Sequence, residues 1–83
     1  MVVEKGGRIE EVKRDPSNKK LLAKISVGTN DRVVKNMTFY VVRGSDFLGN
    51  LVVTEPDLKW SIGEIVLQTG DIKEGDLISS RIQ

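Results

Sequence analysis

Apolar residues along this chain come in short clusters that alternate with polar residues, and the clusters are rich in β-branched side chains. Such alternation is typical of strands with one buried face. The breaks between clusters carry Gly, Asn-Asp, Pro or Gly-Asp, which favour turns. Helix is expected only as single turns near residues 31–35 and 71–74. The six predicted strands cover residues 8–13, 21–27, 38–43, 47–54, 60–68 and 77–82.

Alternation also assigns faces within the strands. In the third strand it places Phe39 in the core and Tyr40 on the opposite face. The sequence Gly44-Ser45-Asp46 predicts a hairpin turn into the fourth strand. Gly49 inside that strand predicts a bulge or a sharp bend, because glycine contributes no packing to a regular strand.

The two halves of the chain match loosely as an internal repeat. Residues 7–9 align with 49–51, residues 23–27 with 63–67, and residues 33–39 with 72–78. Asn36 then falls opposite Gly75, and Asn and Gly are the residues that best tolerate positive φ. Both halves are therefore expected to make a left-handed turn just before a strand. The alternative is that strand-turn-strand sequences resemble one another by chance.

Two similar three-stranded units cannot each bury a face alone, so we expect them to interlock about a pseudo-twofold axis. The fold predicted is a single all-β domain over residues 1–83, a closed or nearly closed six-stranded barrel. A two-sheet β-sandwich is the alternative. Residues 1–6 are expected to be flexible, and the abrupt start leaves open that the chain is a fragment of a longer protein.

Composition limits the kinds of catalytic and metal-binding site that the chain can form. The 83 residues, at 9.2 kDa, are enough for one modest core. Hydrophobic residues make up 39% and charged residues 30%, as in soluble globular chains, and no segment is long and apolar enough to span a membrane. The chain has no His and no Cys, which excludes an imidazole base, a thiolate nucleophile, a zinc finger and a disulfide framework. A domain without cysteine is compatible with the cytoplasm, the periplasm and the cell exterior alike.

A series of turns and core positions runs through nearly the whole chain from Gly7. Its segments are Gly7-x-Ile9, Ile25-Ser26-Val27-Gly28-Thr29-Asn30-Asp31, Asn36-Met37-Thr38-Phe39, Leu48-Gly49-x-Leu51 and Gly75-Asp76. Gly75-Asp76 resembles the Gly-Asp turn of the cradle-loop barrels, which include the double-psi and RIFT types. The whole series is similar to small bacterial barrel domains, among them the C-terminal domain of flagellar assembly protein T and uncharacterised planctomycete-type C-terminal domains. The position of Asn36 is usually glycine in those domains.

This resemblance implies a fold and a class of function. The fold is a cradle-loop or RIFT-like barrel in which Asn36, Gly49, Gly75 and Asp76 are structural turn positions. The function is that of a non-catalytic module, the terminal domain of a larger bacterial protein that holds or docks something. A cytoplasmic or an envelope-associated location would fit equally.

Two groups of residues are candidates for catalysis or metal binding. Ser79 and Ser80 are the candidate nucleophiles. They lie in a predicted strand without a glycine elbow or a neighbouring base, which favours a structural role. Asp71, Glu74 and Asp76 crowd around Gly75 and could serve as acid-base groups or metal ligands. The favoured interpretation of this cluster is structural: Asp71 and Asp76 accept hydrogen bonds from the N–H groups of their own turns. With no nucleotide-binding glycine motif either, no enzyme activity, cofactor or metal is expected.

Charge is divided unevenly along the sequence. Residues 1–43 carry a net +5 and residues 44–83 a net −4, within a total of +1. Lys13, Arg14, Lys19 and Lys20 flank one loop and are expected to form a basic tip. Such a tip could be a solvated loop, a contact for phosphate or nucleic acid, or a contact for an acidic protein surface.

The aromatic residues are few: Phe39, Tyr40, Phe47 and Trp60. This scarcity weighs against a nucleic-acid surface, which needs stacking platforms. Tyr40 is the better candidate for exposure, whereas burial is the commoner outcome for a single Trp in a small core. Both are nevertheless candidates for contact with a partner, because amphipathic aromatics often anchor interfaces.

Three function classes remain. The leading expectation is a non-enzymatic protein-interaction or oligomerisation module, with Lys13, Arg14, Lys19, Lys20, Tyr40 and Trp60 as partner-binding candidates. It requires an exposed apolar patch or an open strand edge. The alternatives are a small nucleic-acid-binding barrel, which requires a basic groove with exposed aromatics, and an enzyme or small-ligand binder at Gly75-Asp76, which requires a pocket with convergent carboxylates.

Overall fold

The computed structural model describes the backbone of residues 3–82 and the side chains of residues 6–79. It contains six strands and one short 3-10 turn, η1 (Thr29–Asp31). The strands are β1 (Val3–Arg14), β2 (Leu21–Ile25), β3 (Thr38–Arg43), β4 (Asp46–Pro56), β5 (Ser61–Val66) and β6 (Leu77–Ile82). All six predicted strands are confirmed, with the second and fifth shorter than expected. Of the two expected helical turns, the first is present as η1, slightly earlier in the chain, while residues 71–74 form no helical turn.

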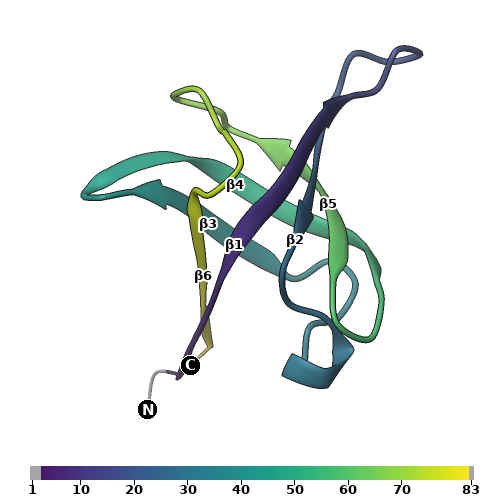
Figure 1. The fold of residues 1–83 in the computed structure, drawn as a ribbon, viewed down its shortest axis with the longest axis vertical. Helices are drawn as coiled ribbons and strands as arrows, with labels where there is room; N and C mark the ends of the chain where they lie inside the picture. Colours follow the sequence, from purple (N-terminus) through teal and green to yellow (C-terminus); the bar gives the residue numbers. More distant parts are fainter. Residues whose placement is uncertain (1–2, 83) are drawn as a thin grey trace.

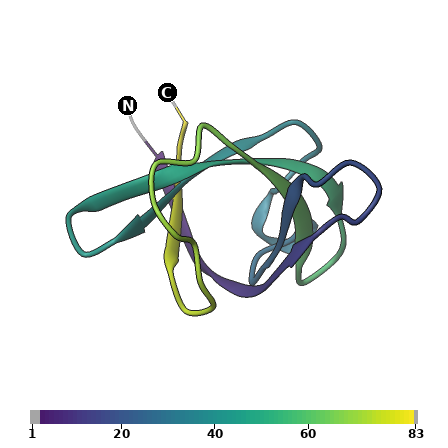
Figure 2. The same ribbon diagram turned by 90° about the horizontal axis from the view of Figure 1, so that it is seen from above.

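The strands close into one barrel in the order β1-β2-β5-β4-β3-β6, and every neighbouring pair is antiparallel (Figures 1 and 2). This confirms the predicted six-stranded all-β barrel. The two-sheet sandwich alternative is wrong, because β3 and β6 pair and close the sheet on itself. The β3–β4 hairpin and the loop of residues 15–20 project from opposite sides of the barrel (Figures 1 and 2).

The first strand begins earlier than the sequence pattern predicts, while the flexibility expected for residues 1–6 stays a prediction. β1 begins at Val3 rather than Arg8, and residues 3–6 pair with residues 79–82 of β6. The sequence pattern missed this start because Gly6 and Gly7 carry no side chains to show an alternating pattern, whereas backbone pairing with β6 continues through them. Residues 1 and 2 lie outside the described residues.

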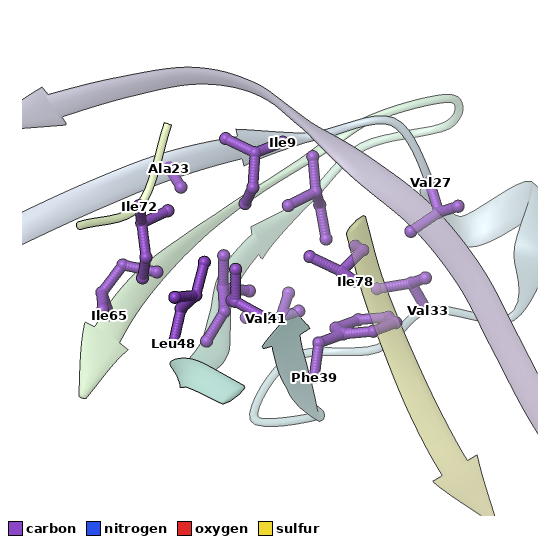
Figure 3. Close-up of a cluster of buried hydrophobic side chains, with 13 residues drawn as sticks. Ile9, Ala23, Val27, Val33, Phe39, Val41, Leu48, Ile65, Ile72 and Ile78 are labelled. Carbon is purple, nitrogen blue, oxygen red and sulfur yellow. The ribbon is translucent and has the colours of Figure 1, made fainter. Parts of the chain in front are cut away.

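One hydrophobic core fills the barrel, and Figure 3 shows its side chains converging from all six strands and from the connecting loops. The predicted faces are confirmed: Phe39 is fully buried while Tyr40 is 45% exposed. Burying each large apolar side chain contributes about 1.5–3 kcal/mol. The core consists of Ile9, Ala23, Ile25, Val27, Val33, Phe39, Val41, Leu48, Leu51, Val53, Ile65, Ile72 and Ile78.

Gly49 lies in the bulge that the sequence predicts. Val41 pairs with Gly49 and Val42 pairs with Phe47, so Leu48 is the extra residue of β4. The bulge turns Leu48 into the core, where it is 7% exposed, and leaves Phe47 on the outside. The bulge therefore decides that the aromatic ring of the hairpin faces outward.

The barrel topology has twofold symmetry. Exchanging β1 with β4, β2 with β5 and β3 with β6 leaves the strand order unchanged. Register shifts also recur at equivalent places, between Ile9 and Glu11 in β1 and between Val53 and Glu55 in β4. The two halves thus follow the same path, although the internal repeat of the sequence itself stays a prediction.

Backbone hydrogen bonds show which residues are equivalent. The Gly75 N–H donates to the Ile9 carbonyl and the Asn36 N–H to the Val53 carbonyl, both at 2.8 Å. Asn36 and Gly75 have φ values of 73° and 92°, as their expected pairing requires. Ile9 therefore corresponds to Val53, two residues from the Leu51 that the sequence alignment favours. A shift of two residues keeps the same face buried, so apolar alternation could not detect it.

Candidate functional site

The outer wall formed by β4, β3 and β6 carries an exposed apolar patch, called here the aromatic face and made of Tyr40, Val42, Phe47 and Leu77. Val42 pairs with Phe47 on β4 and with Leu77 on β6, which sets the three side by side. The rings of Tyr40 and Phe47 meet edge to face, with centroids 6.3 Å apart. Tyr40 and Phe47 are each 45% exposed and Leu77 is 56% exposed. Strand pairing thus fixes the position of an apolar surface that is exposed to solvent.

Next to Tyr40, the aromatic face is bordered by small and polar residues. Tyr40 pairs with Asn50 on β4 and with Ser79 on β6, and Ser79 in turn pairs with Gly6 on β1. The Asn50 Oδ1 is buried and has no hydrogen-bond partner within the described residues. Among the side chains that the structure describes, Gly6 and Ser79 are the small neighbours on this side of Tyr40. Tyr40 itself is 45% exposed at this border.

An ion pair lies beside the turn of the β3–β4 hairpin. Arg43 donates from Nε to Asp76 Oδ1 at 2.8 Å and from Nη2 to Asp76 Oδ2 at 2.9 Å, and Nη2 also donates to the Asp71 carbonyl at 2.9 Å. The hydrogen bonds from Arg43 lower the pKa of Asp76, and a bond from the Lys73 N–H lowers it further against the opposing effect of burial. The hydrogen bond to Asp76 also raises the pKa of Arg43, and the Asp71 and Asp46 carboxylates add to this.

The Asp76 carboxylate of the acidic Gly75-Asp76 turn is engaged in hydrogen bonds within the molecule. The expected bond from the turn's own backbone is confirmed for Asp76, whose Oδ2 accepts from the Lys73 N–H at 2.7 Å. For Asp71, the bond found within the described residues is made by its backbone carbonyl, not its carboxylate. Asp76 is only 5% exposed and both of its oxygens are engaged by Arg43. Among the side chains of residues 6–79, no group of three or more acidic residues is placed to hold a metal ion.

The expected basic tip forms around the turn of residues 15–20. The Asp15 carboxylate accepts from the Ser17 N–H and hydroxyl, and the former bond is the main cause of its lowered pKa. Arg14 Nη1 donates to the Lys19 carbonyl at 2.7 Å, so part of the Arg14 guanidinium holds the turn itself. Lys20 pairs with Glu64 at 3.5 Å. The tip is cationic, but two of its four basic side chains already have partners within the molecule.

A shallow apolar depression of about 100 Å³ lies on the outer wall of β1, β2 and β5. Leu22 and Ile62 supply its apolar surface together with Ala23, and Glu11, Lys13 and Lys24 complete the lining. Lys24 Nζ lies 5.1 Å from the ring centroid of Trp60, which is half-buried rather than enclosed in the core. The depression is therefore bordered by two lysines and one glutamate.

The structure separates the candidate partner residues into two groups. Lys13 lines the depression, Lys20 pairs with β5 through Glu64, and Trp60 packs with Lys24 of β2, so these three lie on the β1-β2-β5 side. Tyr40 lies on β3, which is opposite β2 in the barrel order. No single surface can therefore contain Trp60 and Tyr40 together.

Sequence reasoning missed two parts of the aromatic face. Phe47 could have been found, because a tight turn after Arg43 sets Val42 and Phe47 on neighbouring strands. Leu77 could not, because it meets Val42 only through the β3–β6 pairing that closes the barrel. Ser79, one of the two serines weighed as nucleophiles, is half-buried on the outer wall, and the side chain of Ser80 lies outside the described residues.

Comparisons with known proteins give no relatives: a scan against family models, a search of curated proteins and a search of solved structures each find no match. Within residues 3–82, no helix is long and apolar enough to cross a membrane. The geometry of the surfaces is thus the basis for any functional conclusion.

Proposed function

We propose that this barrel is a non-enzymatic protein-interaction module that docks its partner on the aromatic face. The observation that carries the proposal is the edge-to-face pair of Tyr40 and Phe47, nearly half exposed on a wall fixed by strand pairing. Rigid aromatic side chains lose little entropy on binding and dominate interface energies. The Asn50 side chain, on the strand position opposite Tyr40, adds a buried Oδ1 acceptor that has no hydrogen-bond partner among the described residues.

The resemblance to cradle-loop barrels supports the same proposal. The closed antiparallel barrel and the positive φ of Asn36 and Gly75 are compatible with a barrel of that type. Domains with this pattern in flagellar assembly protein T and in planctomycete-type proteins are terminal appendages. We therefore include in the proposal that the barrel serves as the terminal domain of a larger bacterial protein.

A selection of displayed peptides on the immobilised protein tests the docking surface. The selected peptides are then titrated against the wild type and against Tyr40→Ala. Because exposed aromatic rings often anchor interfaces, we expect loss of the Tyr40 ring to weaken binding at least about tenfold in this variant. Leu58→Ala is the matched control, since Leu58 is 62% exposed but lies outside the aromatic face. Peptides that bind both variants equally, or a selection that yields no binder, would contradict the proposal.

A second candidate is nucleic-acid binding on the β1-β2-β5 side. It is favoured by the position of Trp60 beside Lys24, close to Lys13 in the lining of the depression. Binding of this kind would weaken steeply with salt, because lysines that contact phosphates release counterions. Titration of a labelled single-stranded oligonucleotide at low and high salt distinguishes it: a Tyr40→Ala variant would bind as the wild type does, and a Lys13→Glu variant would not.

A further inference from the structure

The aromatic face and its nearest cross-strand neighbours carry no charge. Tyr40 and Val42 alternate along β3 with buried residues, so they point outward. Cross-strand partners share a face of the sheet, so the register gives their outward neighbours on β4 and β6. These neighbours are uncharged: Phe47, Asn50, Leu77 and Ser79. Any charge that a partner meets at this surface therefore comes from its border.

The adjoining strands bring one basic and one acidic residue to this border. On β1, which lies beside β6 in Figure 1, Arg8 pairs with Leu77. On β5, Glu64 pairs with Val52 of β4. The Glu64 Oε1 lies 3.5 Å from the Lys20 Nζ, so this carboxylate already has a partner within the molecule. The guanidinium beside Leu77 is therefore the charge that the border offers to a partner.

Arg8 is exposed, and its backbone is held in place. Its N–H donates to the Ser26 Oγ at 2.9 Å, and its carbonyl accepts from the Ser26 N–H at 3.1 Å. Among the side chains of residues 6–79, no carboxylate forms an ion pair with the Arg8 guanidinium, and this includes Glu10, two positions along β1. A cation thus extends from a fixed backbone position at the edge of an apolar surface.

Strand pairing limits how a partner can be held at the aromatic face. Tyr40, Val42 and Leu77 each have a paired residue on both neighbouring strands. The Phe47 carbonyl accepts from the Thr69 hydroxyl at 2.8 Å. The face therefore offers no strand edge to which a peptide could add by main-chain hydrogen bonds. The side chains of the partner have to supply the contacts.

We propose that the aromatic face binds a peptide segment that carries an acidic residue close to an apolar one. The apolar side chain packs on Tyr40 and Leu77, and the carboxylate accepts two hydrogen bonds from the planar guanidinium of Arg8. Two strand spacings, roughly 10 Å, separate β1 from β3, so one short segment can reach both. This inference rests on the proposed function, since it names the chemistry of the partner that docks there.

The two contacts affect different rate constants. A charge at the rim of an interface mainly raises the association rate, and salt screens this effect. Apolar anchors mainly slow dissociation. Arg8→Glu therefore lowers the association rate of the partner, whereas Tyr40→Ala raises its dissociation rate.

Surface plasmon resonance with the peptides selected on the wild type tests the inference. Their sequences are enriched in Asp or Glu. Arg8→Glu weakens their binding about tenfold at low salt and less at high salt, mainly through the association rate. Lys19→Glu, at an exposed side chain of the loop of residues 15–20, changes the net charge equally and is the matched control. Selected peptides without acidic residues, or equal binding by Arg8→Glu and the wild type, overturn the inference.

Charge exchange between peptide and protein gives a second test. Replacement of the acidic residue of a selected peptide by Lys weakens its binding to the wild type, and Arg8→Glu restores the binding of this Lys peptide. Arg8→Gln, which removes the charge without reversing it, binds both peptides with intermediate affinity. Trp60 fluorescence and thermal unfolding show that each variant is folded. A folded Arg8→Glu variant that does not restore binding rules out the proposed contact.

The two proposals can fail separately. If selected peptides require Tyr40 but bind Arg8→Glu as they bind the wild type, the aromatic face docks partners of another chemistry and only this inference is wrong. If the selection yields no binder, or binders that do not require Tyr40, the proposed function is wrong and the inference fails with it.

Discussion

At the scale of single residues, Asp76 shows how a buried charge is accommodated. A carboxylate that is 5% exposed would be costly without partners. Three donors satisfy it: Nε and Nη2 of Arg43 and the N–H of Lys73. Arg43 also holds the Asp71 carbonyl. The ion pair therefore fastens the end of β3 to the turn that leads into β6.

The lowered pKa of Asp76 has a consequence for stability. Its ordinary value is 3.8, and a lower value in the folded state means that the unfolded chain binds the proton more readily. The stabilisation is thus complete above about pH 4 and is lost as the pH falls through the folded-state pKa. We expect Asp76→Asn to lower the free energy of unfolding by about 2 kcal/mol at neutral pH. Urea unfolding at about pH 7 and about pH 3 measures both effects.

The control for this prediction is the slope of stability with pH. The variant should lose less stability on acidification than the wild type, although some loss remains because the pKa of Asp15 is also lowered. An identical acid-induced loss in both proteins would show that the ionised Asp76 contributes nothing.

At the scale of elements, β5 depends on a residue without a side chain. Gly63 pairs with Ala23 on β2 and with Val53 on β4. A Cβ atom at this position would overlap the Leu51 side chain and come within 2.8 Å of the Val52 carbonyl oxygen. Leu51 is fully buried and has no room to move aside. Small residues on β2 and β5 therefore make space for Leu51 in the core.

This close packing predicts the effect of a single methyl group. We expect Gly63→Ala to lower the free energy of unfolding by about 1–3 kcal/mol, because a packed core resists added volume. Gly6→Ala in β1 is the control, since the nearest atom to its added Cβ is the Ile78 carbonyl oxygen at 3.9 Å. Thermal or urea unfolding of the two variants should show a loss only for Gly63→Ala, and equal losses would contradict the explanation.

The sequence predicted those elements whose signals are local. Alternation and turn residues were sufficient for all six strands, for the Gly49 bulge and for the exposure of Tyr40. The beginning of β1 was missed, because residues 3–6 are held by backbone pairing with β6 at the other end of the chain. Among the side chains, the pairing of Arg43 with Asp76 and the position of Leu77 beside Val42 depend on barrel closure, which no local pattern encodes.

At the scale of the whole molecule, the barrel separates two kinds of surface. One half of its wall carries the aromatic face, and the other half carries the apolar depression with Lys13. The division of charge along the sequence, +5 in residues 1–43 and −4 in residues 44–83, suggests such a separation only in outline. Strands from both sequence halves contribute to each wall, so the assignment of charges to surfaces required the strand order.

The twofold strand order has a consequence for how the chain can be cut and rejoined. Exchange of the two halves places the β6–β1 pair where the β3–β4 hairpin lies, and Val3 and Ile82 are already paired side by side. A circular permutant with a short linker between the ends and a new opening between Gly44 and Ser45 would run β4-β5-β6-β1-β2-β3. We expect it to unfold in a single transition, within about 2 kcal/mol of the natural chain.

Urea unfolding followed by Trp60 fluorescence checks this expectation, and a permutant opened inside β4, between Leu51 and Val52, is the control that should fail to fold. A permutant opened at Gly44 that is equally unfolded would mean that the two halves are not interchangeable. If it folds, the barrel can form from a chain that begins with either half.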